Sequence, residues 1–311
     1  MTDLTGVILA AGKGSRMQPF SDFCPKSALP ILGKPIVVHQ LEMMQRLGIR
    51  RVIVVVGHLG YRVVTAVSSY PVASQLNIEY VDQKETLGIA HALGTLESRV
   101  EGALMMFLGD IYFITERLGE MVEMYGRHGV GAVLAAKVER DPQAVSRNFA
   151  IFEDDRGYVT RVVEKPRHAR TNLKGCGLYL FGPDIFDAIR RTPRTAMRDE
   201  YEITNSIQIL VEDGIGVKAA RVIDDDLNLT VAGDLLAINQ AELDRLGHRN
   251  FIAPGTELPA TVELDRCTVG RHVRFAGPAT LERCVLFDDV VVPAGLERSN
   301  AILFGEHIVA C

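Results

Sequence analysis

One stretch near the N-terminus, Gly6–Lys26 (GVILAAGKGSRMQPFSDFCPK), constrains this chain more than any other. Its apolar run, Val7–Ala10, is bounded by glycine and is typical of a buried strand in a parallel sheet. The turn that follows lies where such sheets place ligands, at the carboxyl end of a strand. Small residues there let backbone N–H groups approach a phosphate, and Lys13, Arg16 and Lys26 add positive charge. The stretch therefore indicates an anion-binding loop.

Two familiar phosphate loops do not fit this stretch. A dinucleotide fingerprint needs glycine where Met17 stands, and the P-loop pattern GxxxxGK[ST] is absent from the chain. The stretch instead resembles the signature of the sugar-1-phosphate nucleotidyltransferases, with Ser21 in place of the usual Thr. The matching residues are Leu9, Ala10, Ala11, Gly12, Gly14, Arg16, Met17, Pro19, Pro25, Lys26, Leu29, Pro30, Gly33, Lys34 and Pro35. The resemblance implies an enzyme that joins a nucleoside triphosphate to a sugar 1-phosphate and releases pyrophosphate.

Composition narrows the classes of protein further. The chain has 311 residues, of which 47% are hydrophobic and 23% are charged, so it can bury a large core. A net charge of −5 argues against a nucleic-acid-binding protein, which carries basic patches. Five scattered cysteines without a CxxC pair favour a reducing cytoplasm over a disulfide framework or a zinc site. No apolar run reaches membrane-spanning length and no signal-peptide pattern begins the chain, so we expect a soluble cytoplasmic protein.

The order of the predicted elements favours an α/β fold with a doubly wound, mixed but mostly parallel sheet. Up to about residue 135, predicted strands at 51–57, 78–81 and 103–108 alternate with predicted helices at 35–47, 61–68 and 88–98. Further strands at 132–138, 149–153, 158–164 and 175–181 suggest a mixed sheet that covers the first half as a lid or substrate wall. A helix at 231–245 closes this part. We predict a catalytic domain over residues 1–247.

The sequence pattern changes at about Ile252, after which apolar residues recur roughly every six positions. A hexapeptide period is the mark of a left-handed parallel β-helix, and a β-sandwich fragment is the alternative. We predict a small β-helix domain over residues 250–311, with about three coils of roughly 18 residues each. A short coil with an apolar edge needs its open end covered, so we expect a homo-oligomer.

The resemblance assigns the cationic residues of the loop to the triphosphate. Arg16 is expected to bind the β and γ phosphates and the transition state, and Lys26 the α-phosphate and the leaving pyrophosphate. In the family, an oxygen of the sugar phosphate attacks the α-phosphorus in line. Catalysis is then mainly positioning and neutralisation of charge.

Two residues are candidate ligands for Mg²⁺, the cofactor that the resemblance implies. Asp110 follows a buried strand, and magnesium prefers oxygen ligands together with substrate phosphates. A plain Gly-Asp turn is the alternative. Asn228 holds the family's second ligand position, where the N-acetylglucosamine-1-phosphate uridylyltransferase branch also has Asn. For the acidic run before it, Asp224–Asp226, a solvated turn is the alternative interpretation.

The segment QKETLGIAHAL matches the family block that reads the base. A Gln amide offers a donor and an acceptor, which suits the paired N3–H and O4 edge of uracil or thymine. The guanylyl branch commonly has Glu at the position of Gln83. The resemblance implies a nucleotide-binding set of Leu9, Ala11, Gly12, Gly14, Gln83 and Gly88.

Two further segments are matched to the sugar 1-phosphate. Glu164 and Lys165 belong to the family's EKP motif, in which Glu accepts hydrogen bonds from sugar hydroxyls and Lys binds the sugar phosphate. We count Lys165 among the catalytic residues, with Arg16, Lys26 and Asp110. Glu200 and Thr204 lie in a block that is similar to the family's GExxIT block and are expected to line the same site.

The sequence departs from the family pattern at two sugar-site positions. Ala150 stands where the family has the glycine of a Tyr-Gly turn, and Gly175 stands where the uridylyl branch has an Asn that contacts an N-acetyl group. An added methyl group and a lost amide both alter the sugar pocket. The departures argue against N-acetylglucosamine and for a less usual sugar.

Three hypotheses follow. The first is a Mg²⁺-dependent transferase that uses UTP or dTTP. The second keeps the fold but uses GTP or ATP, as guanylyl- and adenylyltransferases with similar tails do. The third is a regulatory protein that binds an NDP-sugar without turnover, although such a protein would not need all four of the catalytic residues. The short tail, without a histidine cluster, argues against a second acetyltransferase activity.

Overall fold

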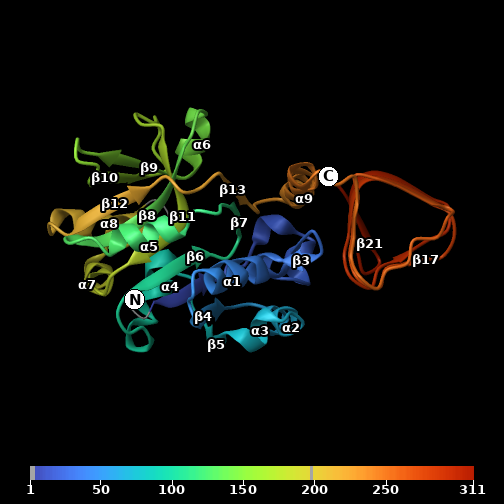
Figure 1. The fold of residues 1–311 in the computed structure, drawn as a ribbon, viewed down its shortest axis with the longest axis horizontal. Coiled ribbons are helices and arrows are strands. Elements are labelled where there is room, and N and C mark those ends of the chain that lie inside the picture. The colour runs from blue at the N-terminus through green and yellow to red at the C-terminus, as the bar shows by residue number, and fades with distance from the viewer. Residues whose placement is uncertain (1–3, 197–198) are drawn as a thin grey trace. The chain divides into compact units, whose positions relative to one another are not determined.

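The computed structural model describes residues 4–196 and 199–311, which form two compact units (Figure 1). Unit 1 contains Gln40–Asp226 together with the described residues up to Gly12. Unit 2 contains Lys13–His39 and Leu227–Cys311. The chain therefore passes from one unit to the other inside the glycine-rich stretch.

A nine-stranded sheet forms the centre of unit 1, in the order β10-β9-β11-β6-β1-β4-β5, with β8 paired to β11 and β12. The strands are β1 (Thr5–Leu9), β4 (Arg51–Val56), β5 (Asn77–Asp82), β6 (Leu104–Leu108), β8 (Val130–Val138), β9 (Phe149–Glu153), β10 (Val159–Glu164), β11 (Leu173–Phe181) and β12 (Gly216–Ala220). The pairs β6-β1, β1-β4 and β4-β5 are parallel, whereas β11 is antiparallel to β6, β8 and β9. The sheet is therefore mixed, as the sequence predicts.

The helices follow the sequence predictions where the apolar period is long. They are α1 (Ile36–Arg46), α2 (Gly60–Ser68), α3 (Val72–Gln75), α4 (Ile89–Gly94), α5 (Gly119–Tyr125), α6 (Pro142–Arg147), α7 (Asp184–Arg191), α8 (Ile203–Glu212) and α9 (Ala232–Leu246). Helix α7 has acidic residues in its first turn and arginines in its last, which suits the helix dipole. Helix α9 ends at Gly247, which has a φ of 68° and a left-handed conformation that glycine accepts without strain. Among the described residues, none of the helices is long and apolar enough to cross a membrane.

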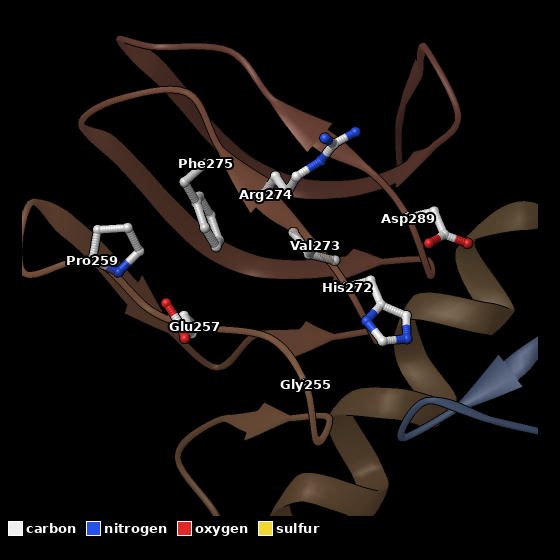
Figure 2. A pocket seen from close by; sticks show the side chains of 8 residues that line it. All are labelled: Gly255, Glu257, Pro259, His272, Val273, Arg274, Phe275 and Asp289. Carbon is white, nitrogen blue, oxygen red and sulfur yellow. The ribbon is translucent and has the colours of Figure 1, made fainter.

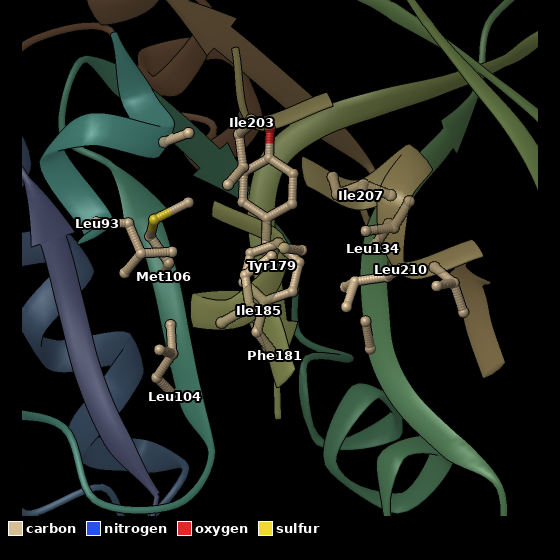
Figure 3. Close-up of a cluster of buried hydrophobic side chains, with 14 of the residues drawn as sticks. Leu93, Leu104, Met106, Leu134, Tyr179, Phe181, Ile185, Ile203, Ile207 and Leu210 are labelled. Carbon is tan, nitrogen blue, oxygen red and sulfur yellow. The ribbon is translucent and has the colours of Figure 1, made fainter. Parts of the chain in front are cut away.

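Buried aliphatic and aromatic side chains from the sheet and from α4, α7 and α8 form a large core cluster in unit 1 (Figure 3). Tyr179 and Phe181 on β11 lie at its centre, with ring centroids 5.4 Å apart. Met106 from β6 and Ile207 from α8 pack in the same cluster. Each fully buried side chain of this size stabilises the fold by about 1.5–3 kcal/mol, so this cluster fixes the sheet to its helices.

Parallel strand pairing continues in unit 2 after α9. The strands after α9 are β14 (Phe251–Ile252), β15 (Val262–Asp265), β16 (Thr268–Val269), β17 (Arg274–Phe275), β18 (Ala279–Leu286), β19 (Val291–Val292) and β20 (Leu296–Phe304), followed by the antiparallel β21 (His307–Ala310); unit 2 also contains the short hairpin of β2 (Pro30–Ile31) and β3 (Lys34–Pro35). Thr268 pairs with Val285, and Val285 with Ile302, a constant offset of 17 residues. Each turn of chain thus stacks on the one before it, in the three-sided outline that Figure 1 shows. We call residues 251–311 the coil region; the left-handed sense stays a prediction.

Two predictions about unit 1 are wrong in part. The middle strands, β8–β11, do not form a separate layer over the first half, because they join the same sheet as β1 through the β11-β6 pair. The helix predicted at 88–98 ends at Gly94 and is followed by a 3₁₀ turn at Glu97–Arg99. The short elements β7 (Ile111–Ile114), α5, α6, β12 and β13 (Asp225–Asn228) have no counterpart in the prediction, since their apolar patterns are too short to show a period.

Candidate active site

Small residues bring three parallel strands of unit 1 close together at their carboxyl ends. A Cβ atom on Gly109, directly after β6, would lie 2.7 Å from the carbonyl oxygen of Leu9. A Cβ atom on Gly57, directly after β4, would lie 2.8 Å from the carbonyl oxygen of Ala11. Glycine is therefore required at both positions, and the predicted base-pocket residues Leu9 and Ala11 lie at this edge. Gly12 is exposed, with open space where its side chain would be.

Asp110 lies at the same edge and is half-buried. The side chain of Gln40 on α1, which is 1% exposed, brackets it: its Nε2 atom donates hydrogen bonds to the carbonyl oxygens of Leu108 and Ile111, each at 2.9 Å. These bonds fix the backbone on both sides of the candidate metal ligand. Sequence reasoning missed Gln40, because nothing in the pattern of α1 distinguishes it from other polar residues.

The predicted base-reading segment follows β5 at this edge. The N–H of Gln83 donates to the carbonyl of Val56 at 2.7 Å, and its side-chain Nε2 donates to the carbonyl of Glu85 at 2.8 Å. Gly88 has a φ of 109°, and a Cβ atom there would lie 2.6 Å from the carbonyl oxygen of Tyr201. The base-reading segment is therefore packed directly against the segment that contains Glu200 and Thr204.

The predicted sugar-site residues lie on neighbouring strands of the same sheet. Ala150 pairs with Lys174 and with Val163, which places it beside Gly175 and Glu164. Thr204, 2% exposed, donates a hydrogen bond from Oγ1 to Oε2 of Glu164 at 3.4 Å. The structure thus brings Ala150, Glu164, Gly175 and Thr204 together. The side chain of Glu200 is not part of this group of contacts; its carbonyl accepts a hydrogen bond from Thr195.

Lys165 has a φ of 39°, which is unusual for a residue with a side chain. Its N–H donates to the carbonyl of Asn148 at 2.8 Å, and its Nζ lies 3.9 Å from Oε1 of Glu164. Its side chain is 45% exposed, so the ammonium group is accessible to a ligand. Strained backbone of this kind is concentrated at functional sites, which agrees with the role predicted for Lys165.

Gly175 has a direct structural explanation. A Cβ atom at this position would lie 1.8 Å from the ring of Phe149, which also stacks on Tyr179 with a centroid distance of 6.1 Å. The ring thus occupies the space that the Asn side chain of the uridylyl branch would need. Tyr179 itself is a core residue: burial, with a further contribution from Glu164, raises the pKa of its phenol well above the ordinary value.

A buried polar cluster lies on β11 next to Gly175 and was not predicted. Lys174, 4% exposed, forms an ion pair with Oδ1 of Asp226 at 2.7 Å, and Oε2 of Glu139 lies 3.7 Å from the same ammonium group. Lys137 forms a second ion pair, with Asp225, at 2.7 Å. Burial raises the pKa of Asp226, although Lys174 opposes the shift. The acidic run is therefore not a solvated turn, since Asp226 is 5% exposed and Asp225 is paired.

Four of the predicted site residues lie in unit 2: Gly14, Arg16, Lys26 and Asn228. Gly14 has a φ of 63°, and a Cβ atom there would lie 3.1 Å from the aliphatic chain of Lys26, which runs across it. The Nζ of Lys26 donates to the carbonyl of Leu229 at 2.7 Å, next to Asn228. Arg16 is exposed on a 3₁₀ turn at Ser15–Met17.

A surface pocket of about 660 Å³ lies on the coil region (Figure 2). Its lining includes His272, Arg274, Phe275 and Asp289. None of the predicted site residues lines this pocket, and its mixed charges do not favour a polyphosphate.

Comparison with known proteins agrees with this geometry. Residues 5–225 match the family model described as Nucleotidyl transferase. A UTP–glucose-1-phosphate uridylyltransferase of Haloferax volcanii is 34% identical over 220 residues, which cover 70% of this chain and 88% of that protein. A glucose-1-phosphate thymidylyltransferase of Streptomyces antibioticus is 30% identical over 287 residues, which cover 89% of this chain and 78% of that protein.

The fold is shared with solved structures as well. A UDP-glucose pyrophosphorylase complexed with UDP-glucose has a TM-score of 0.68 at 21% identity, over 78% of this chain and 99% of that one. The matched family model covers more than half of the chain and spans the whole sheet of unit 1. On these grounds the chain belongs to the sugar-1-phosphate nucleotidyltransferase family and is an enzyme of that family.

Proposed function

We propose that this enzyme joins a pyrimidine nucleoside triphosphate, UTP or dTTP, to a sugar 1-phosphate, giving an NDP-sugar and pyrophosphate. The observation that carries the proposal is the convergence of two segments in unit 1. The base-reading segment at Gly88 packs on Tyr201, three residues before Thr204, and Thr204 is hydrogen-bonded to Glu164 of the EKP motif. A nucleotide and a sugar bound to these segments would be neighbours.

Gln83 supports a pyrimidine base. It lies directly after β5, at the edge where the parallel strands end. Its amide supplies the acceptor and the donor that uracil and thymine require. Two of the relatives are named as uridylyl- and thymidylyltransferases of glucose 1-phosphate, which agrees with this assignment.

Positively charged side chains are needed because two anions must meet. Two unit charges about 4 Å apart repel by roughly 4 kcal/mol at an effective dielectric constant of about 20. We assign Arg16 to the β and γ phosphates, Lys26 to the α-phosphate and Lys165 to the sugar phosphate. Once these side chains neutralise the charges of the phosphates, an oxygen of the sugar phosphate attacks the α-phosphorus in line and pyrophosphate leaves.

We assign Mg²⁺ to the carboxylate of Asp110 and the amide oxygen of Asn228. Both are oxygen donors, and magnesium is commonly held by one or two protein oxygens together with substrate phosphates. The half-buried position of Asp110, with its backbone fixed on both sides by Gln40, fits such a ligand. The ion would supply charge neutralisation at the phosphates.

We expect a sugar without an N-acetyl group, because position 175, where the uridylyl branch has an Asn that contacts this group, is glycine in this chain. Gly175 has no side chain to contact such a group, and the ring of Phe149 occupies the space above it. Ala150 is fully buried and adds a methyl group where the family has glycine. Glucose 1-phosphate, the substrate in the names of two relatives, is the first sugar to test.

The proposal is tested by pyrophosphate release in Mg²⁺, with UTP, dTTP, CTP, GTP and ATP each paired with glucose, mannose and N-acetylglucosamine 1-phosphate. We expect release with UTP or dTTP and loss of release in Asp110→Asn, which keeps the size of the side chain and removes its charge. Release confined to GTP or ATP would overturn the base assignment. No release with any pair, with NTP binding intact, would favour either a sugar phosphate outside this set or a regulatory protein.

A further inference from the structure

The loop that carries Arg16 and Lys26 is packed into the C-terminal part of the chain. Its residues, Lys13–His39, form one compact unit with Leu227–Cys311. The matched family model ends at residue 225, so most of what holds this loop in unit 2 lies beyond the residues that the model matches. This arrangement raises the question of what the coil region contributes to the loop.

Five rings join the loop to the last two coils. Phe20, 1% exposed, lies with its ring centroid 4.6 Å from that of Phe304 and 5.9 Å from that of Phe287. The ring centroid of Phe23 lies 5.8 Å from that of Phe304 and 5.2 Å from that of His307. The ring centroids of His307 and Phe304 are 4.9 Å apart. We call these five residues the aromatic clasp. Phe304 touches all four of the others.

The coil geometry places two of these rings in one column. Phe287 directly follows β18, Phe304 ends β20, and the two positions are separated by the offset of 17 residues that relates successive coils. The N–H of Phe287 donates to the carbonyl of Leu303 at 2.9 Å, and the two ring centroids are 5.8 Å apart. The last two coils therefore present a rigid pair of rings to Phe20.

The loop has little regular structure of its own to set its position. Between Arg16 and Lys26 it contains only 3₁₀ turns of three residues, the second of which is Phe20–Asp22. Such turns have no long ladder of backbone hydrogen bonds, so contacts with neighbouring elements decide where they lie. Phe20 stands between the two cations in the sequence, and its ring is the more deeply buried of the two rings that the loop contributes to the clasp.

Three hydrogen bonds fix the loop further along. The amide of Asn239, a fully buried residue of α9, donates to the carbonyl of Pro30 at 3.1 Å and accepts the N–H of Leu32 at 2.9 Å. Lys26 is held by the carbonyl of Leu229. With the C-terminal end of the loop fixed in this way, the clasp adds a contact at its middle.

We infer that Phe304 and Phe287 are positioning residues for the triphosphate-binding loop, so that the coil region sets the enzyme's affinity for the nucleotide as well as its stability. The inference rests on the proposed roles of Arg16 and Lys26. It predicts a selective effect on the nucleoside triphosphate, because Arg16 and Lys26 belong to unit 2 together with the clasp, whereas the sugar-site residues belong to unit 1.

The test compares Phe304→Ala with Phe275→Ala in the full chain. Phe275 is the control, because it is a half-buried phenylalanine outside the clasp that packs on the core of the same coil region and lines the pocket of Figure 2. We expect Phe304→Ala to raise KM for the nucleoside triphosphate about tenfold, since aromatic contacts of this kind are individually worth up to roughly a factor of ten. KM for the sugar phosphate, and both KM values of Phe275→Ala, should stay within about twofold of wild type.

A second readout does not depend on turnover. Hydrogen–deuterium exchange of residues 15–29 should be faster in Phe304→Ala than in the wild-type protein and unchanged in Phe275→Ala. In Phe304→Leu the exchange rate should lie between those of Phe304→Ala and the wild-type protein. If the wild-type protein transfers no nucleotide but the exchange result holds, the proposed function fails and the clasp stands. Equal exchange of this segment in the wild-type protein and Phe304→Ala, or equal loss of both substrates' affinity in the two alanine variants, would overturn the inference.

Discussion

Gly88 shows how a single residue links the two predicted substrate segments. Its φ of 109° and ψ of 170° are accessible almost only to glycine, and the backbone of Tyr201 lies where a side chain would start. The N–H of Tyr201 also donates to the carbonyl of Leu87 at 2.8 Å. The family motif predicts a glycine here, but its contact with Tyr201 is visible only in the folded chain.

Gly88→Ala is expected to lower the free energy of unfolding by at least about 3 kcal/mol and to reduce kcat/KM, because both the backbone conformation and the contact with Tyr201 are lost. Gly129→Ala is the control, since Gly129 has a φ of 79° and nothing lies within 4 Å of the added Cβ atom. The control should lose only about 1–2 kcal/mol. If urea unfolding gave the same loss of free energy of unfolding for both variants, the contact with Tyr201 would not contribute to stability.

Gln40 and Gly175 have tertiary contacts that the residue types alone did not predict. Gln40 reaches carbonyl groups more than 60 positions away in the sequence, so no local pattern indicates its role. Gly175 was recognised as a departure from the family, but its cause, the ring of Phe149, depends on the register of β9 against β11. Both findings concern partners brought together by the sheet.

At the scale of elements, an ion pair joins β11 to β13. Lys174 on β11 and Asp226 on β13 are both at least 95% buried, and their charged atoms are 2.7 Å apart. A buried pair adds little stability compared with apolar side chains of equal size, but the loss of one partner leaves an uncompensated charge. The pair therefore holds Asp226 against β11 within unit 1.

Asp226→Asn is expected to lower the free energy of unfolding by about 3–5 kcal/mol, because the ammonium group of Lys174 loses its closest anion. In the double variant Lys174→Met, Asp226→Leu, most of that loss should be recovered. Chemical denaturation of the three proteins measures the effect. A double variant as unstable as Asp226→Asn would contradict this interpretation of the pair.

Long periodic elements were predictable and short ones were not. Helix α1 and strand β4 begin and end within about one residue of their predicted bounds, since apolar side chains repeat through them without interruption. Strand β12 is only five residues long and pairs in parallel with β8, which lies far before it in the sequence. Its place depends on a partner that local patterns do not identify.

For the whole molecule, self-association through the coil region remains a prediction, and the structure indicates the edge to test. Strand β21 lies at one end of the sheet order of the coil region, and Ile308 on it is 42% exposed. Exposed edge strands with apolar side chains favour pairing with a second chain. We expect light scattering to give a mass above that of a monomer at micromolar concentration.

Ile308→Lys should shift the protein towards the monomer, because a lysine on an edge strand opposes pairing. Glu306→Lys is a suitable control, since it changes charge in the turn before β21 and not on the strand. A wild-type protein that is a monodisperse monomer would contradict the prediction of self-association. An oligomer that is unaffected by Ile308→Lys would place the interface elsewhere.

The sequence by itself determined the family and the mixed α/β fold and predicted the residues of an anion-binding loop, because each depends on local chemistry: a strand, small residues and cations at fixed spacing. Only the tertiary structure decided which parts of the chain hold that loop. Phe20 and Phe304 are separated by most of the chain, and their contact, 4.6 Å between ring centroids, exists because the last coils stack in register. Packing of this kind is set by the whole fold and leaves no period or motif for a sequence to reveal.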